Sequence, residues 1–258
     1  MTELGSYVYG VARGLDPATV AGLSGVAGSP VRVVVHGALS ALVSPVDLAE
    51  FDESGLRRNF EDLSWLEATA REHHAVLAAA ALDAAVVPLR LATIYRSADG
   101  VRTLLAERGA TFDAALSRVQ GRTEWGLKAY LDPGEHSAPP VDLADAGPPG
   151  TAYLLRRRAH LRGSEELRHT AEHGAEVIHR AVSAAAEAAR RYPPQDTRLS
   201  GQSSEMVLNA TYLLSGTDRA PLEEALRQTG SWPLQVEWTG PWVPYSFVEL
   251  EPDRELIP

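Results

Sequence analysis

Histidines at helical spacing are the side chains of this sequence that come closest to a chemical motif. His169 and His173 are four residues apart, and Glu166 and Glu176 lie on the neighbouring turns. A helix would place the two imidazoles on one face, which is an arrangement that can bind a metal ion. The run lacks the His-Glu-x-x-His order of helical zinc sites, and we interpret it as a solvated helix face. The sequence thus predicts no bound metal and no cofactor.

A second pair, His73 and His74, lies in the run "WLEATAREHH", where Glu67 precedes His74 by seven residues. A carboxylate and an imidazole on one helix face could form an acid–base dyad. The nucleophile that such a dyad would activate is missing, because the chain has no Cys and no Gly-x-Ser-x-Gly sequence. The glycines of "GLSGVAGSP" match neither common phosphate-binding pattern. We therefore expect no enzyme activity and no small-molecule substrate.

The charge balance argues against other classes of partner. The 258-residue chain has 34 acidic and 24 basic residues and a net charge of −10, which is not the basic footprint of a nucleic-acid-binding protein. The most apolar run is interrupted by Asp83 and Pro88 and is too short to span a bilayer. No basic segment precedes an apolar run at the start, and the lack of Cys suits a reducing compartment. We expect a cytoplasmic protein that binds neither nucleic acid nor membrane.

One arginine stands inside an apolar run. Arg90 interrupts "VVPLRLATIY", which has the composition of a strand. A buried guanidinium requires a carboxylate or an anionic ligand. We therefore expect Arg90 to be a structural residue that is buried between a helix and the sheet, paired with Glu61, Asp62 or Glu67.

Three consecutive arginines, Arg156, Arg157 and Arg158, lie near the start of a predicted long helix. The helix dipole disfavours cations at that end, so no local interaction explains the cluster. A solvated run and a surface for an acidic partner are the two interpretations. The three arginines are therefore candidate partner-binding residues.

The hydrophobic pattern predicts that the first 96 residues form a strand, a helix, two strands, a helix and a strand. In the first helix, Asp16 is the expected N-cap and Pro17 the first residue. A further helix is expected to begin at Ser97. The predicted elements lie at 6–13, after Asp16, and at 31–37, 38–46, 60–85 and 86–96.

The same order returns in the second half, with elements at 123–132, 151–192, 197–201, 205–215, 218–230 and 234–240. We therefore predict an α+β protein with two domains, 1–120 and 121–258, each of ferredoxin-like β-α-β-β-α-β order. The long helix 151–192 has a heptad-like seam typical of a coiled coil. Its partner is either the helix after Ser97 or another protein. The seam consists of Ala171, Ala175, Ile178, Val182, Ala185 and Ala189.

Aromatic residues are concentrated in "EWTGPWVPYSF", residues 237–247. Alternation places Trp238 on the core face of the last strand, and Pro241 prevents the ladder from continuing. We expect Trp242 and Tyr245 to lie beyond the strand and to cover a seam between the domains. A partner surface and a small-molecule pocket are the alternatives. Trp125, on the strand 123–132, is with Trp238 a predicted structural residue.

Five segments of the sequence resemble the gas vesicle protein F and L family. The resemblance extends from about Tyr7 to Phe247, with two departures: Leu91–Ala92 stand where the family usually has Phe-Gly, and Val243 stands where it has Pro. The F and L types are not separated by these motifs. The segments are "RNFEDLSWLEATAREHHAVL", "VVPLRLATIY", "GRTEWGLKAY", "SGQSSEMVLNATYLLS" and "TGPWVPYSF".

The resemblance implies a non-enzymatic, cytoplasmic protein that helps to assemble the gas-filled protein shell that gives cells buoyancy. It implies as partners the small hydrophobic major shell protein and other accessory proteins. It also implies two domains, the second ferredoxin-like with a coiled-coil portion. The residues alone leave a second class open, which is a ligand-binding regulatory protein built on tandem ferredoxin-like domains.

Overall fold

The structure is a computed structural model that describes residues 3–132, 134, 149–195 and 204–248. The described residues fall into two compact units. The first unit takes its residues from Met1–Thr123 and from Trp242–Pro258, and the second from Glu124–Pro241. The chain therefore leaves the first unit, forms the second and returns. The prediction of a second domain at 121–258 assigned the returning residues to that domain, whereas in the structure they belong to the first unit.

The first unit is built on an antiparallel sheet with the strand order β2-β3-β1-β4, in which β5 also pairs with β1. The single strand predicted at 86–96 is divided in two, because residues 89–93 form a turn. The N–H group of Thr93 donates to the carbonyl of Arg90. The strands are β1 (Leu4–Arg13), β2 (Arg32–His36), β3 (Leu39–Asp47), β4 (Val86–Pro88) and β5 (Ile94–Tyr95).

The first unit has one long helix, α3 (Leu63–Ala80), whose first turn is capped by Asp62. The helix predicted after Asp16 is a single 3₁₀ turn, although Asp16 caps it as expected. The helix predicted from Ser97 is divided in two at Arg108. The other helices are η1 (Pro17–Val20), η2 (Val26–Gly28), α1 (Leu48–Phe51), α2 (Glu53–Asn59), α4 (Ala98–Glu107) and α5 (Gly109–Val119).

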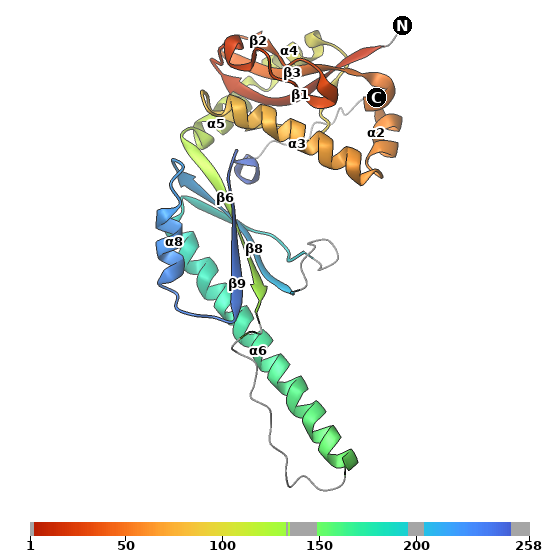
Figure 1. The fold of residues 1–258 in the computed structure, drawn as a ribbon. Coiled ribbons are helices and arrows are strands. Elements are labelled where there is room, and N and C mark those ends of the chain that lie inside the picture. The colour runs from red at the N-terminus through yellow and green to blue at the C-terminus, as the bar shows by residue number, and fades with distance from the viewer. Residues whose placement is uncertain (1–2, 133, 135–148, 196–203, 249–258) are drawn as a thin grey trace. The chain divides into compact units, whose positions relative to one another are not determined.

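Both faces of the first sheet are covered. Tyr7 and Tyr9 of β1 point into a core that contains Leu77 of α3, whereas Val8 points into a second core that contains Phe112 of α5. The two cores are thus formed with α3 on one face and with α4 and α5 on the other, and Figure 1 shows α3 running along the sheet. Because neither face of β1 meets solvent, its interior is apolar on both faces, as in strands of sheets covered on both sides.

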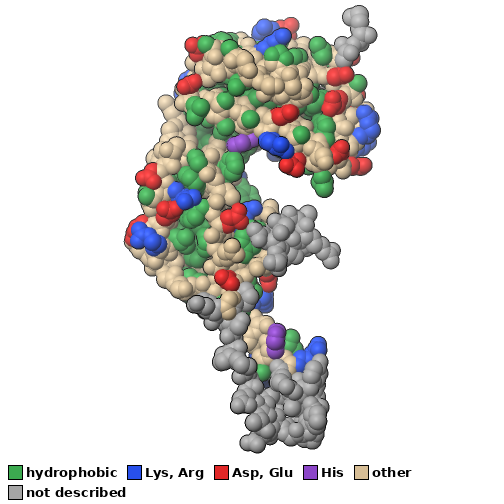
Figure 2. Space-filling model, viewed as in Figure 1, with side chains coloured by type: hydrophobic (Ala, Val, Ile, Leu, Met, Phe, Trp, Pro, Cys, Tyr) green, Lys and Arg blue, Asp and Glu red, His purple; other side chains and the backbone are tan. Residues whose placement is uncertain are grey.

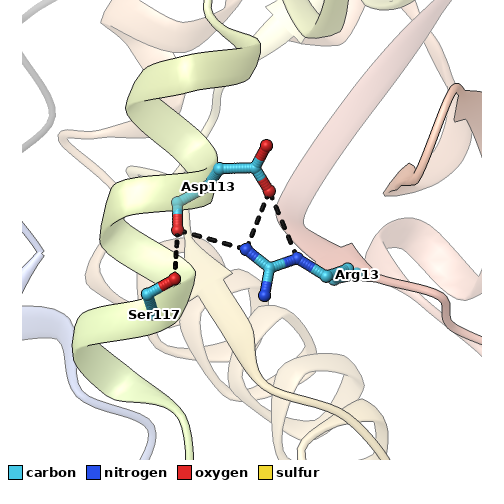
Figure 3. Close-up of polar contacts among 3 residues, drawn as sticks. All are labelled: Arg13, Asp113 and Ser117. Carbon is cyan, nitrogen blue, oxygen red and sulfur yellow. Dashed lines mark hydrogen bonds and ion pairs between the residues drawn. The ribbon is translucent and has the colours of Figure 1, made fainter.

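An ion pair holds α5 to the end of β1. The guanidinium of Arg13 donates from Nε and Nη2 to one carboxylate oxygen of Asp113, at 3.2 and 2.8 Å, and Nη2 also reaches the Asp113 carbonyl. Ser117 donates to the same carbonyl (Figure 3). Both charged side chains are about half exposed, so the pair positions the helix more than it stabilises it.

The second unit contains a four-stranded sheet with the order β7-β8-β6-β9. Counted along the chain, both sheets have the order second, third, first, fourth. The strand predicted at 197–201 lies outside the described residues. The elements are β6 (Arg122–Leu131), α6 (Pro149–Ala185), β7 (Ala188–Arg191), β8 (Met206–Ser215), α8 (Ala220–Arg227) and β9 (Leu234–Trp242).

The long helix α6 ends at Ala185, and not at residue 192 as predicted. Residues Ala188–Arg191 form β7, which pairs antiparallel with β8 at the edge of the sheet. Ala189 is therefore not on the seam. The buried part of the seam packs on β8 and α8 of its own unit, which is neither of the two partners predicted for it. The buried seam residues are Ala171, Ala175, Ile178 and Val182.

No helix among the described residues is long and apolar enough to cross a membrane.

Candidate partner-binding surfaces

The aromatic C-terminal segment is anchored in the first unit. Val243 and Phe247 are both buried, and Val243 belongs to the core that contains Tyr7 and Leu77. The segment ends in a short 3₁₀ turn, η3 (Tyr245–Phe247). Val243 and Phe247 thus hold this segment in place, while Trp242 and Tyr245 remain accessible to solvent.

Trp242 and Tyr245 lie against α3 with part of each ring in solvent. The prediction that Pro241 ends the last strand before Trp242 is wrong, because β9 continues to Trp242. The Trp242 ring meets the His74 ring edge-on at 4.8 Å. The Tyr245 ring lies 6.4 Å from that of His73 and 6.5 Å from that of His74. Trp242 is 40% exposed and Tyr245 is 38% exposed. Aromatic residues with one face packed and one edge wet are typical of binding surfaces.

The histidine beneath this surface belongs to the core. His73 is 3% exposed, and its Nδ1 lies 2.9 Å from the hydroxyl of Tyr7. The same hydroxyl accepts from the N–H of Ala92. Burial, and then the neighbouring His74, lower the pKa of His73 to about 4, so the ring is neutral near pH 7.

The possible dyad of Glu67 with the two histidines is not assembled. Glu67 is exposed and pairs with Arg71 at 2.9 Å, whereas His73 is held by Tyr7. Neither Tyr7 nor Tyr9 is among the predicted site residues, although their alternate positions in β1 place both rings on one face of the sheet. That alternation is the signal by which they could have been found.

Both tryptophans predicted to be structural meet at one arginine of the second unit. The guanidinium carbon of Arg219 lies 5.0 Å from the centre of the Trp125 ring and 5.5 Å from that of Trp238. Glu223 accepts a hydrogen bond from Nε of Arg219 at 2.8 Å. Trp125 is buried and Trp238 is half-buried against the same core. A cation between two rings and a carboxylate orients all of these side chains.

The prediction for Arg90 is wrong. Its side chain is exposed, because β4 ends at Pro88 and Arg90 begins the turn that Thr93 closes. The strand-like composition of residues 86–96 concealed this turn. Arg90 is therefore neither buried nor between a helix and the sheet.

The arginine cluster lies on α6. Arg157 and Arg158 are exposed, and the side chain of Arg156 lies outside the described residues. At this end, α6 extends beyond the sheet of its unit (Figure 1). These positions are compatible with either interpretation of the cluster, a solvated run or a surface for an acidic partner.

Both histidines of the α6 pair are exposed. They differ in that the ring of His173 lies 5.5 Å from that of Trp232. Gly174 leaves the space that Trp232 occupies, since a Cβ there would come within 2.5 Å of the indole. Within the described ranges, no three His, Asp, Glu or Cys side chains are grouped as a metal would require.

The fold and these surfaces define a class of protein: a two-unit α+β protein with exposed aromatic and basic groups. The model of the family described as "Gas vesicle synthesis protein GvpL/GvpF" matches residues 5–249. The chain therefore belongs to this family, as its motifs indicated. The family is one of gas vesicle accessory proteins. Figure 2 shows the surface of the described residues, coloured by type of side chain.

Individual relatives agree with this membership. The chain is 39% identical to gas vesicle protein L of a Streptomyces species, over 96% of this chain and 94% of the relative. It is 29% identical to gas vesicle protein F of the same species, over 95% and 100% of the two chains. Both types are thus similar to this chain over nearly its whole length.

Solved structures share the fold. The crystal structure of gas vesicle protein GvpF from Anabaena has a TM-score of 0.65 at 17% identity and covers 96% of this chain and 97% of its own. The corresponding structure from Microcystis aeruginosa has a TM-score of 0.61 at 18% identity, with 95% and 99% covered. The mixed α+β architecture is therefore common to these proteins.

Proposed function

We propose that the protein is an accessory factor of gas vesicle assembly that binds the hydrophobic major shell protein and other accessory proteins in the cytoplasm. Family membership over residues 5–249 carries this proposal. A shell subunit with an apolar surface is prone to aggregate before it is assembled. An acidic protein that binds such a subunit would keep it soluble until it joins the shell. No catalytic step is needed for this role.

Trp242 and Tyr245 are the proposed contact residues for the shell protein. Their anchored but accessible rings support this assignment, since aromatic residues dominate the energetics of protein interfaces. Arg156, Arg157 and Arg158 are the proposed contacts for an acidic accessory partner. We further propose that both units are variants of the ferredoxin-like plan, which their common strand order supports.

The test is a pull-down of the co-expressed major shell protein with Trp242→Ala, Tyr245→Ala and the parent chain. Leu82→Ala is the matched control, because Leu82 is a large exposed apolar residue of the same unit. We expect Trp242→Ala to reduce capture about tenfold or more, while the melting temperature falls only slightly. Leu82→Ala should change neither quantity.

The same measurements distinguish the alternatives. If Trp242→Ala lowers stability by about 3 kcal/mol and leaves capture intact, the ring is a packing element and the proposed contact is wrong. If the parent chain itself fails to capture shell protein, and is also absent from purified vesicles, the proposed function fails. Charge reversal of Arg157 and Arg158 should affect accessory partners without affecting the shell protein.

A further inference from the structure

One flank of α3 has apolar residues at core spacing that the structure leaves wholly or partly exposed. Leu63, Leu66 and Ala70 follow each other by three and four residues, and His74 comes four residues later. This spacing places all four on one side of a helix. The sequence pattern suggests a buried face, yet Leu63 is 78% exposed, Ala70 is exposed, and Leu66 and His74 are only half-buried.

The residues that α3 does bury lie on a different side of the helix. Thr69, His73, Val76, Leu77 and Ala80 face the core, and they are centred about a quarter-turn from the row that begins at Leu63. The uncovered row is therefore additional to the core face. It is the apolar surface that a second helix packed along α3 would bury.

The row continues into the aromatic surface of the C-terminal segment. Trp242 packs on His74, so the row from Leu63 to His74 ends against a partly exposed indole. His74 lies eleven positions after Leu63, which corresponds to about 16 Å along the helix axis. A partner helix of about three turns would span this length.

The charge around the row selects the partner. Residues 50–74 span the row and contain seven carboxylates against three arginines, and one of these arginines, Arg71, pairs with Glu67. Asp62 and Glu61 lie at the end of the row and Glu67 lies beside it, one position after Leu66. An acidic border around an apolar row favours a helix that has Lys or Arg beside its apolar face.

We propose that this flank of α3, Leu63, Leu66 and Ala70 together with Trp242, is the docking site for a basic amphipathic helix of a partner protein. The inference rests on the proposed function only in supposing that the chain has protein partners. It adds the chemical class of the element that is bound and the surface that receives it.

The probe is a fluorescent peptide of about 18 residues built from Leu, Ala and Lys, with Leu at i, i+3, i+4 and i+7. A scrambled peptide of the same composition and a peptide with Glu in place of Lys are the reference ligands. Binding to the full chain is measured by fluorescence anisotropy. The variants are Leu63→Ser, Ala70→Lys and Glu67→Lys, with Leu82→Ser as the matched control.

We expect the patterned basic peptide to bind the parent chain at least tenfold more tightly than either reference peptide. Leu63→Ser and Ala70→Lys should each weaken binding about tenfold, Glu67→Lys should weaken it several-fold, and Leu82→Ser should leave it unchanged. All these positions are exposed, so circular dichroism should show the parent fold in every variant.

Equal binding of the patterned and scrambled peptides would overturn the proposal, because attraction by charge alone would then explain it. Loss of a dimer of the chain on Leu63→Ser in sedimentation would also overturn it, because a second copy would then occupy the face. Retained capture of shell protein with no peptide binding would reject this inference and leave the proposed function standing. Peptide binding without shell capture would support the inference and reject the proposed function.

Discussion

The two units share a strand order but differ in how deeply a helix covers the sheet. In each unit, Nδ1 of a helix histidine forms a 2.9 Å hydrogen bond with the hydroxyl of a tyrosine on a central strand. The pairs are His73 with Tyr7 in the first unit and His179 with Tyr212 in the second. His73 is fully buried, and its pKa falls to about 4. His179 is half-buried; burial and Arg191 lower its pKa, while Glu176 opposes them.

The comparison shows that the same pair of residue types has different electrostatics in the two units. The first sheet has a core on each of its faces, so the interior around His73 is remote from water. The second unit has its principal core beneath α6 and α8, and charged groups reach His179. Depth of cover, and not the hydrogen bond itself, decides how strongly protonation opposes folding.

The largest expected effect concerns the second core of the first unit. Phe112→Ala should cost about 4 kcal/mol, because it removes a fully buried ring. Hydrogen exchange measured by mass spectrometry should show faster exchange in the first unit and no change in the second. Leu222→Ala, in the core of the second unit, is the reciprocal control. Simultaneous loss of protection in both units would show that they unfold together.

The next effect is a loss of stability in acid that is larger in the first unit. The folded pKa of His73 lies below its ordinary value of 6.5, so its contribution is complete above pH 6.5 and is lost as the pH falls towards 4. The total is about 3 kcal/mol. Urea denaturation between pH 7 and about 4 measures it. His73→Asn should remove most of this dependence, and His179→Asn should remove less; an equal effect of the two would contradict the comparison.

A smaller effect is expected at Arg219. Arg219→Met keeps much of the side-chain volume but removes the charge between Trp125 and Trp238, and should cost about 1 kcal/mol. Thermal unfolding and the tryptophan emission spectrum are the measurements. Arg158→Met, an exposed arginine of the same unit, is the control. No difference between the two variants would mean that the stacking contributes nothing.

The smallest effect is expected at Arg90. Its exposed side chain predicts a change within about 0.5 kcal/mol for Arg90→Ala, measured from the denaturation midpoint in urea. This is well below the cost of breaking a buried ion pair, about 3 kcal/mol or more. If Arg90→Ala lowered the free energy of unfolding by about 3 kcal/mol, Arg90 would have to be in a buried ion pair, as the sequence suggested.

Local patterns in the sequence predicted most of the elements. Alternating apolar residues indicated β1, β3, β6 and β8, and the Asp16–Pro17 pair indicated the cap of η1. The family motifs predicted membership, which the match over residues 5–249 confirms. These signals are short-range, because strand alternation and capping depend on residues within one element.

Other features depended on residues far apart in the chain. The seam pattern continued to Ala189, but pairing with β8 converted residues 188–191 into an edge strand, since sheet hydrogen bonds outweigh helix propensity there. Arg90 lay in a strand-like run, but the turn closed by Thr93 turned it to solvent. In α3, His73 is buried with its Nδ1 2.9 Å from the hydroxyl of Tyr7, a residue 66 positions earlier in the chain.

The sequence by itself determined the family, through its motifs, and the α+β character and the positions of most strands, through its periodicity. Only the tertiary structure decided that Val243 returns to the core of the first unit, and that Leu63 and Ala70 remain exposed although their spacing is that of a buried face. The physical reason is that periodicity tells which side chains share a face, whereas burial depends on whether another part of the chain covers that face.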